Sequence, residues 1–166
     1  MSDWHYDWQN SVPKDNQEVM LTLGDIKHRA DVLIGRTVTE FQRSDISSKA
    51  FSDRNNFYFN LGYKVIWVFD FREQFASGRL CFEADRKTFH WTKPRNTFNL
   101  YEIMTGQVEL FFQLEDDGEN ALVKIANVSP SGFEQFTVSN WFSKDQFLKY
   151  LGIHNGCCAA PTHEDL

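Results

Sequence analysis

Alternating hydrophobic and polar residues along the chain predict several β-strands. Residues 18–23 alternate in this way, and the β-branched and apolar residues at 32–34 and 37–39 flank the pair Gly35-Arg36. Residues 63–71 are almost continuously apolar, which is typical of a strand buried on both faces. We expect such a strand to lie beside a parallel neighbour, reached through a helical crossover.

Two helices are predicted around these strands, one before the first strand and one before the apolar strand. Ser2 can cap a short helix that carries Trp4 and Trp8 on one stripe and His5 on the next, and Pro13 ends it. A second helix is expected from residue 47 to about 61, where the apolar residues recur at helical spacing. The order is therefore helix, three strands, helix, strand, which describes an α/β fold.

The rest of the sequence predicts a β-rich extension that ends in a helix. Strands are expected at 107–114, 121–125 and 133–138, with a short one at 89–91 and a terminal helix over 143–151. The other residues of 72–106 show no clear pattern. We expect one domain over 1–154, with a core at 2–71 and an extension at 72–154, followed by a flexible tail at 155–166.

The hairpin around Gly35 is predicted to bring two carboxylates together. Gly in the first position of a two-residue loop fits a type II′ turn. Pairing Ile34 with Thr37 then places Asp31 opposite Glu40 and residue 29 opposite residue 42. Side chains alternate along a strand, so Phe41 points to the other face, into apolar packing.

Paired carboxylates of this kind suggest a metal site. Two like charges on directly opposed strand positions repel each other unless a cation or a shared proton relieves them. Mg²⁺ or Mn²⁺ is the simplest relief, and Mg²⁺ is usually held by one or two carboxylates together with phosphate oxygens and water. The pattern of Asp31 and Glu40 therefore points to phosphate chemistry. The alternative is a half-exposed hairpin that carries an acid on each strand by coincidence.

Composition and charge narrow the class of protein. The hydrophobic share of 42% indicates a folded globule. The sequence contains no apolar run near the ~20 residues that span a bilayer and no signal-peptide pattern, so we expect a cytoplasmic protein without a membrane partner. The three cysteines have no metal-ligand spacing.

The net charge of −6 is unevenly distributed along the sequence. Residues 1–101 hold 14 Lys and Arg against 13 Asp and Glu, whereas residues 102–166 hold 3 against 10. The acidic excess therefore lies in the C-terminal part. Basic residues around the hairpin are available for phosphate contacts, among them Arg29, Arg43 and Arg54.

Several motifs taken in order resemble the nuclease domain of CoiA-like competence proteins. They are Asp3-Trp4-His5, His28-Arg29-Ala30-Asp31-Val32, Glu40-Phe41-Gln42-Arg43-Ser44, Arg54 with Tyr58, and Val65-Ile66-Trp67-Val68-Phe69-Asp70. That family belongs to the PD-(D/E)XK restriction-endonuclease-like superfamily. The resemblance, clearest over residues 2–71, implies a restriction-endonuclease-like core and a nuclease that acts on DNA with Mg²⁺ or Mn²⁺.

The resemblance also implies roles for individual residues. Asp31 and Glu40 would be metal ligands, and Gln42 would stand where the superfamily usually has lysine, orienting water by hydrogen bonding alone. His5 would assist as a proton donor or acceptor or bind phosphate; the alternative is a capping or packing role. The expected nucleic-acid contacts are Arg29, Arg43, Ser44 and Arg54. Trp4, Trp8, Tyr58 and Trp67 are expected in the core.

Two other functions are compatible with the sequence. The neutral Gln42 and the acidic C-terminal part favour a non-catalytic module of nuclease fold that binds nucleic acid or a protein. Alternatively, Arg29 or Arg36 pairs with the two acids in a purely structural role. Binding of Mn²⁺ that depends on Asp31 distinguishes the nuclease from both alternatives.

Overall fold

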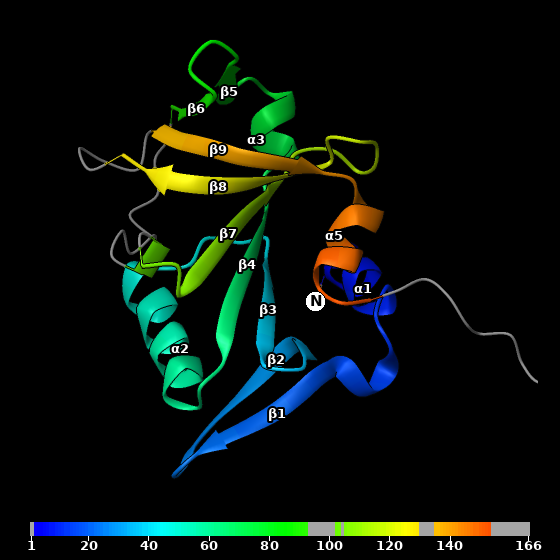
Figure 1. Cartoon of the computed structure of the whole chain (residues 1–166), viewed down its shortest axis with the longest axis vertical. Helices are drawn as coiled ribbons and strands as arrows, with labels where there is room; N and C mark the ends of the chain where they lie inside the picture. The colour runs from blue at the N-terminus through cyan, green and yellow to red at the C-terminus, as the bar shows by residue number, and fades with distance from the viewer. Residues whose placement is uncertain (1, 93–101, 104, 130–134, 154–166) are drawn as a thin grey trace, which may run out of the picture.

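In the computed structural model, which describes residues 2–92, 102–103, 105–129 and 135–153, nine strands form one sheet in the order β1-β2-β3-β4-β7-β8-β9-β6-β5 (Figure 1). The N-terminal elements are α1 (Asp3–Asn10), a 3₁₀ helix (Lys14–Asn16), β1 (Gln17–Leu23), β2 (Ile26–Ile34), β3 (Thr37–Gln42), α2 (Ser48–Asn60) and β4 (Lys64–Asp70). The others are α3 (Arg72–Ala76), β5 (Leu80–Glu83), β6 (Thr88–Trp91), β7 (Val108–Gln113), β8 (Leu122–Val128), β9 (Gln135–Phe142) and α5 (Lys144–Tyr150). The protein is therefore of the α/β class.

The middle of the sheet has the strand directions that the sequence predicts. β2 is antiparallel to its neighbours β1 and β3, and β3, β4 and β7 run parallel. The β2–β3 register pairs Ile34 with Thr37 and Val32 with Thr39. Gly35 has a φ of 56°, and Arg36 does not share this left-handed conformation. The turn thus has the positive φ at its first position that a type II′ hairpin requires.

The helices form because their ends are capped and because one face of each is buried. The side chain of Ser2 accepts a hydrogen bond from the backbone N–H of His5, and that of Ser47 accepts one from Ala50. Ser143 and Gln146 form a capping box at the start of α5. These local signals explain why the three predicted helices are present at nearly the predicted positions.

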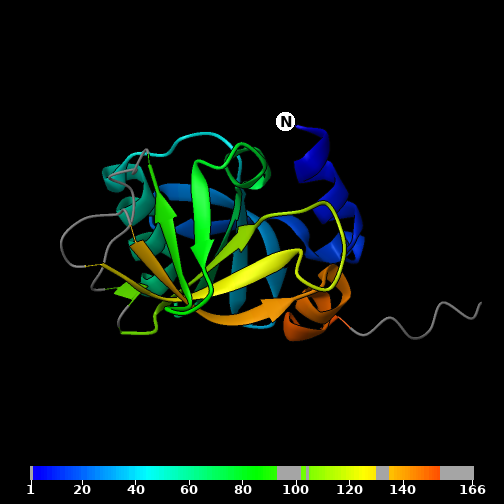
Figure 2. The same ribbon diagram turned by 90° about the horizontal axis from the view of Figure 1, so that it is seen from above.

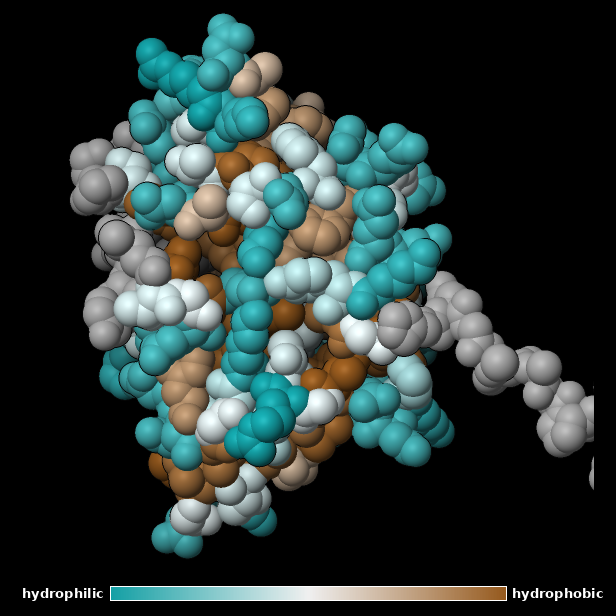
Figure 3. Space-filling view, viewed as in Figure 1, coloured by the Kyte–Doolittle hydropathy of each residue, from teal (hydrophilic) through white to brown (hydrophobic). Residues whose placement is uncertain are grey.

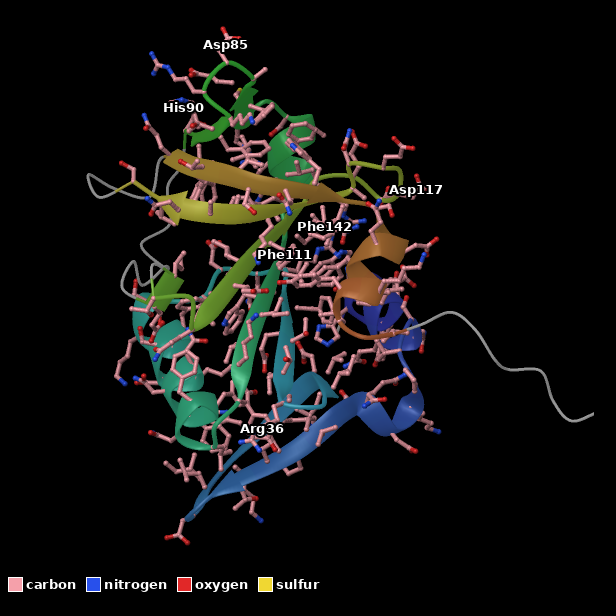
Figure 4. The ribbon with its side chains drawn as sticks, viewed as in Figure 1. Arg36, Asp85, His90, Phe111, Asp117 and Phe142 are labelled. Atoms are coloured by element: carbon pink, nitrogen blue, oxygen red, sulfur yellow. The ribbon has the colours of Figure 1, made fainter. Side chains whose placement is uncertain are left out.

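Two apolar cores lie on opposite faces of the sheet. The first contains Phe51, Phe57 and Tyr58 of α2 together with inward-facing residues of β4 and β7. The second contains residues of α1 and α5, and Figure 4 shows Phe111 and Phe142 pointing toward α5. As predicted, all four aromatic residues expected in the core are buried: Trp4, Trp8, Tyr58 and Trp67.

A polar network crosses the sheet next to α5. Glu109 accepts hydrogen bonds from Lys64 at 2.6 Å, from Lys124 at 3.0 Å and from the Tyr150 hydroxyl at 2.6 Å. Figure 3 shows hydrophilic residues over the middle of this view of the molecule, between hydrophobic ones. The network ties β4, β7 and β8 to α5, and it provides a half-buried carboxylate outside the candidate site.

The C-terminal residues extend the same sheet, because β7 pairs with β4 and β8 and β9 follow. The predicted strand at 89–91 is present as β6. The sequence did not indicate α3 and β5, which are only 5 and 4 residues long. The expected tail at 155–166 lies outside the described residues. Within the described part of the chain, no helix combines the length and apolar character needed to cross a bilayer.

Gln113, at the end of β7, attaches α1 to the sheet. Its side-chain Oε1 accepts hydrogen bonds from the indole N–H groups of Trp4, at 2.7 Å, and Trp8, at 2.8 Å. Its Nε2 donates to the carbonyl of Glu115 at 2.9 Å. Gln113 is fully buried. Because buried indole N–H groups need acceptors, this one amide fixes the position of α1.

Replacing Gln113 with leucine should destabilise the fold. The substitution keeps a similar volume but leaves two buried indole N–H groups without an acceptor, at an expected cost of about 3 kcal/mol. The melting temperature should fall by roughly 6–12 °C in thermal unfolding followed by circular dichroism. Gln135→Leu, at an exposed position of β9, is the matched control and should change it little. Equal melting temperatures for the two variants would contradict the anchoring role of Gln113.

Candidate active site

Asp31 lies where the hydrogen-bond ladders on both sides of β2 are interrupted. The β1–β2 register pairs Gln17 with Val32 and Val19 with Ala30 and leaves out Glu18 and Asp31. Glu18 has a φ of 48°, which is rare for a residue other than glycine. The β2–β3 ladder ends at Val32, one pair before Asp31 and Glu40. Such irregularities re-aim side chains, and here the backbone is arranged to present a carboxylate.

The carboxylate of Asp31 is held by the neighbouring strand. Its Oδ2 accepts the backbone N–H of Phe41 at 2.8 Å, in place of the ladder bond that would otherwise use this donor. The side chain retains 18% of its exposure. One oxygen of Asp31 is therefore fixed by β3, and the carboxylate remains accessible from solvent.

Glu40 is the buried acid of the site. Its Oε2 accepts a hydrogen bond from Arg54 Nη1 at 2.9 Å, and its Oε1 accepts one from the Tyr58 hydroxyl. Burial and the charge of Asp31 raise the pKa of Glu40 to about 8, although Arg54 and Tyr58 act in the opposite direction. Without a compensating cation, Glu40 therefore favours its protonated, neutral form at neutral pH.

Arg54 and Tyr58 reach Glu40 from the same face of α2. They are four residues apart, a spacing that places both side chains toward β3. The guanidinium of Arg54 also lies over the ring of Trp67, 5.7 Å from the ring centroid. Burial first, and then the neighbouring carboxylate of Glu40, raise the pKa of Tyr58, so its hydroxyl stays protonated and acts as a donor. Tyr58 therefore has a site contact that the sequence did not reveal, although its spacing from Arg54 was a usable signal.

His5 approaches Asp31 from α1, on the other side of the sheet from Arg54. Its Nε2 lies 3.3 Å from Asp31 Oδ1 and 3.0 Å from Gln9 Nε2. The hydrogen bond to Asp31 raises the pKa of His5 against the opposing effect of burial. A proton on Nε2 is donated to Asp31, whereas a neutral ring without that proton accepts from Gln9. Gln113 of β7 holds α1 in place, and α1 carries His5. The position of His5 therefore depends on β7.

Gln42 and Ser44 lie at the end of β3. The Gln42 amide nitrogen donates to the carbonyl of Ser44 at 2.7 Å and to its hydroxyl at 3.1 Å. This leaves the amide oxygen as the atom through which Gln42 can accept a hydrogen bond from water. Arg43, which follows, has Nε 3.6 Å from Asp70 Oδ2 and is largely exposed.

Most of these side chains surround a cavity of about 590 Å³, whereas Glu40 and Tyr58 are buried and do not line it. It is lined by Ser2, His5, Asp31, Phe41, Gln42, Arg43, Ser44 and Arg54. Figure 2 shows α1 and the chain between β3 and α2 on the same side of the molecule, where they border this space. The structure thus brings together nearly all of the residues expected to form the site, and it adds Ser2, whose expected role was only that of a helix cap.

Arg29 and Arg36 lie away from the two acids. Arg29 is paired with Glu18 at 3.7 Å and does not line the cavity. Arg36 donates to the carbonyls of Leu61 and Gly62 at the end of α2. Neither arginine pairs with the two acids, as the structural alternative required. That place is taken by Arg54, because α2 packs against β3 while the turn that carries Arg36 lies at the other end of the strand.

The donor atoms of the site fit a hard divalent cation. Mg²⁺ in proteins is held by one or two carboxylates, with water and phosphate oxygens completing its coordination. Asp31 provides a carboxylate at the open cavity and Glu40 a buried one, and each has about four lone-pair sites, more than its present hydrogen bonds use. Within the described ranges, no group of three His, Cys, Asp or Glu side chains is arranged to hold a metal. Any cation here would therefore rely on two protein ligands.

Comparison with known proteins identifies a family for this chain. The model of the family described as competence protein CoiA, nuclease-like domain, matches residues 6–146. The match extends well beyond residue 71 and includes the strands that complete the sheet. Searches among curated proteins and among solved structures gave no match. The matched range covers most of the chain, and the protein belongs to the CoiA nuclease-like domain family.

Proposed function

We propose that the protein is a divalent-metal-dependent nuclease that hydrolyses phosphodiester bonds of DNA, with Asp31 and Glu40 as the ligands of Mg²⁺ or Mn²⁺. The observation that supports this most strongly is the pairing of Asp31, which lines the cavity, with the buried Glu40, whose pKa burial and the charge of Asp31 raise to about 8. Burying an acid beside a second acid is unfavourable unless a cation or a proton compensates. In a nuclease, a bound divalent cation would compensate for this cost.

The finer description of the fold is part of the same proposal. The elements from α1 to β4 would form the restriction-endonuclease-like core of the PD-(D/E)XK superfamily, with α3 to α5 as its extension. In support, the order of these elements is helix, three strands, helix, strand, and β3 and β4 are parallel. The acids lie on β2 and β3 of this unit.

The chemistry can be assigned to individual atoms. A divalent cation, when bound, supplies charge stabilisation at the phosphoryl group and lowers the pKa of water. Gln42 orients the attacking water through its amide oxygen. Arg54 stabilises the negative charge that develops on the phosphate, since a guanidinium has five donors and one bond to Glu40 leaves others. His5 Nε2 holds or transfers a proton at the opposite wall.

The DNA would lie across the mouth of the cavity. Arg43, Ser44 and Arg54 line the cavity and offer donors to phosphate oxygens. Arg29, which is paired with Glu18 away from the cavity, is not part of this contact. Contacts to the backbone phosphates predict binding that weakens with salt and depends little on sequence.

Cleavage assays with and without metal test the proposal. The purified chain should cut single-stranded, duplex or branched DNA in Mg²⁺ or Mn²⁺ and should stop when EDTA is added. Calorimetric titration with Mn²⁺ should show binding that is lost in Asp31→Asn. If none of the three substrates is cut in the presence of Mn²⁺, the proposal is wrong and the non-catalytic module becomes the better description.

Replacing Gln42 with alanine should slow cleavage without removing it. The expected loss is about 10- to 100-fold, the usual effect of an outer group that orients a metal site. Gln42→Lys restores the residue that is usual in the superfamily and should retain activity. Single-turnover cleavage rates at saturating Mn²⁺ measure the effect. An unchanged rate in Gln42→Ala would exclude a role for this side chain in orienting water.

A further inference from the structure

A second cavity, of about 320 Å³, adjoins the candidate active site at the carboxyl ends of the parallel strands. It is lined by Arg43, Asp70, Arg72, Glu73, Gln74 and Asp116. Arg43 lines both cavities, and the register places Gln42 of β3 beside Phe69 of β4, one residue before Asp70. Figure 2 shows α3 on the same side of the molecule as α1 and the β3–α2 connection. The two cavities therefore form one path across the ends of β3 and β4.

Arg72 is the rigid cation of this second cavity. Its Nε and Nη2 donate to the two oxygens of Asp70, both at 2.8 Å, and the Asp70 side chain is only 6% exposed. This bidentate pair, tightened by Asp116, keeps the pKa of Arg72 high. The guanidinium plane is thereby fixed, and its Nη1 edge points toward the loop between β7 and β8. A fixed guanidinium edge matches the geometry of a phosphate.

An exposed carboxylate occupies that edge. Arg72 Nη1 donates to Asp116, whose side chain is 81% exposed. Ion pairs of such exposure contribute little free energy, because water competes for both partners. Glu73, the other acid of the cavity, is paired with Arg79 at 2.9 Å. Asp116 is thus the one acid of the cavity that is both exposed and paired with the open edge of Arg72, and an incoming anion can displace it.

The second cavity also contains an unused hydrogen-bond acceptor. Gln74 Oε1 is buried and has no hydrogen-bond partner within the described residues. A buried acceptor without a donor is unfavourable, so a ligand that brings a donor is favoured there. A nucleotide carries hydroxyl or N–H donors next to its phosphate, whereas a simple inorganic anion such as sulfate carries none. The lining therefore suits a nucleotide unit of a longer strand.

We propose that Arg72 and Arg43 form a second phosphate subsite for the nucleic-acid strand being cleaved, and that Asp116 occupies this subsite in the free protein. This inference rests on the proposed nuclease function, because it extends the substrate from the reacting phosphate to a neighbouring one. The substrate is then a polynucleotide that crosses the ends of β3 and β4. Asp116 acts as an internal competitor that the strand must displace.

Two neighbouring acids allow a matched test. Asp116→Asn removes the competitor, and Asp117→Asn makes the same change of charge one residue away on the same exposed loop, where Figure 4 shows Asp117. The affinity for a fluorescein-labelled DNA strand is measured by anisotropy in EDTA, so that no cleavage occurs. Asp116→Asn should bind about three- to fivefold more tightly than Asp117→Asn. Arg43→Gln should bind more weakly and lower the salt slope by about one.

The outcomes separate the subsite from the nuclease function. Equal affinities for Asp116→Asn and Asp117→Asn would overturn the subsite, because only net charge would then matter. An absence of DNA binding in all variants would overturn it as well. Cleavage by the wild type with equal affinities contradicts the subsite alone. Tighter binding by Asp116→Asn, without cleavage by any variant, supports the subsite and contradicts the nuclease function.

Discussion

Asp31→Asn should lower the rate of DNA cleavage by about 1,000-fold or more, which corresponds to about 4 kcal/mol of transition-state stabilisation. Asparagine keeps the size of the side chain and can still accept the N–H of Phe41 through its Oδ1, so the local fold should remain. What is lost is the negative charge that we propose binds the cation. The loss should therefore appear in catalysis and in Mn²⁺ affinity, with little change in melting temperature.

Asp25→Asn is the matched control for this substitution. Asp25 lies in the exposed turn between β1 and β2, at the far end of the strand that carries Asp31. Asp25→Asn makes the same change of charge as Asp31→Asn, and this variant should cleave DNA at the wild-type rate. The two variants are compared by their multiple-turnover cleavage rates at about 10 mM Mg²⁺. A titration checks that the metal is saturating. Wild-type activity in Asp31→Asn would remove Asp31 from the proposed metal site.

Glu40 should make the protein less stable as the pH rises in the absence of divalent cations. In the folded protein its pKa is about 8, above the value near 4.5 of an unperturbed glutamic acid. Between these two values the folded state binds more protons than the unfolded state, so the free energy of unfolding falls with rising pH. The loss can reach about 5 kcal/mol over the whole interval, and less where Arg54 shares the charge.

His5 contributes to the same trend over a narrower range. Its pKa is raised in the folded state, so its stabilising contribution is present below the pH at which unfolded histidine titrates and is lost as the pH rises through the folded value.

Comparing the wild type with Glu40→Gln isolates the contribution of Glu40. Glu40→Gln should have a larger free energy of unfolding than the wild type at pH 8, with a smaller difference at pH 5. Denaturant titrations in EDTA at both values measure it.

Glu109 provides the contrasting control. Burial alone would raise the pKa of Glu109, but hydrogen bonds from Lys64, Tyr150 and Lys124 outweigh burial and hold it below the usual value. Glu109 therefore stabilises the fold above the pH at which an unfolded glutamate titrates, and this contribution is lost as the pH falls. Glu109→Gln should thus destabilise the protein at pH 8. An equal effect of Glu40→Gln and Glu109→Gln at pH 8 would contradict the special environment of Glu40.

Local patterns were sufficient to predict the hairpin and most of the helices. The turn at Gly35 and the alternation of side chains fix the β2–β3 register from residues that are close in sequence. Ser2, Ser47 and Ser143 cap their helices by bonds to residues three positions away. In each case the interaction that decides the structure lies within one turn or one strand pair.

Contacts between distant residues could not be predicted in the same way. Arg54, rather than Arg29 or Arg36, forms the ion pair with Glu40, and this depends on how α2 is placed over the sheet. The position of His5 near Asp31 depends on α1, which is held by Gln113. The alternation of strand residues gives the face of a side chain but not the helix that will cover it. The tertiary packing of helices on the sheet therefore decided which charges meet.

The bond between Gln113 and the two indoles has a consequence for how the protein is made. Trp4 and Trp8 lie 109 and 105 positions before their acceptor. A nascent chain on the ribosome can form the β2–β3 hairpin early, but it cannot fix α1, and with it His5, until β7 has been synthesised. Chains interrupted before that point should carry both acids without an ordered His5. Synthesis of the chain through β7 thus precedes completion of the site.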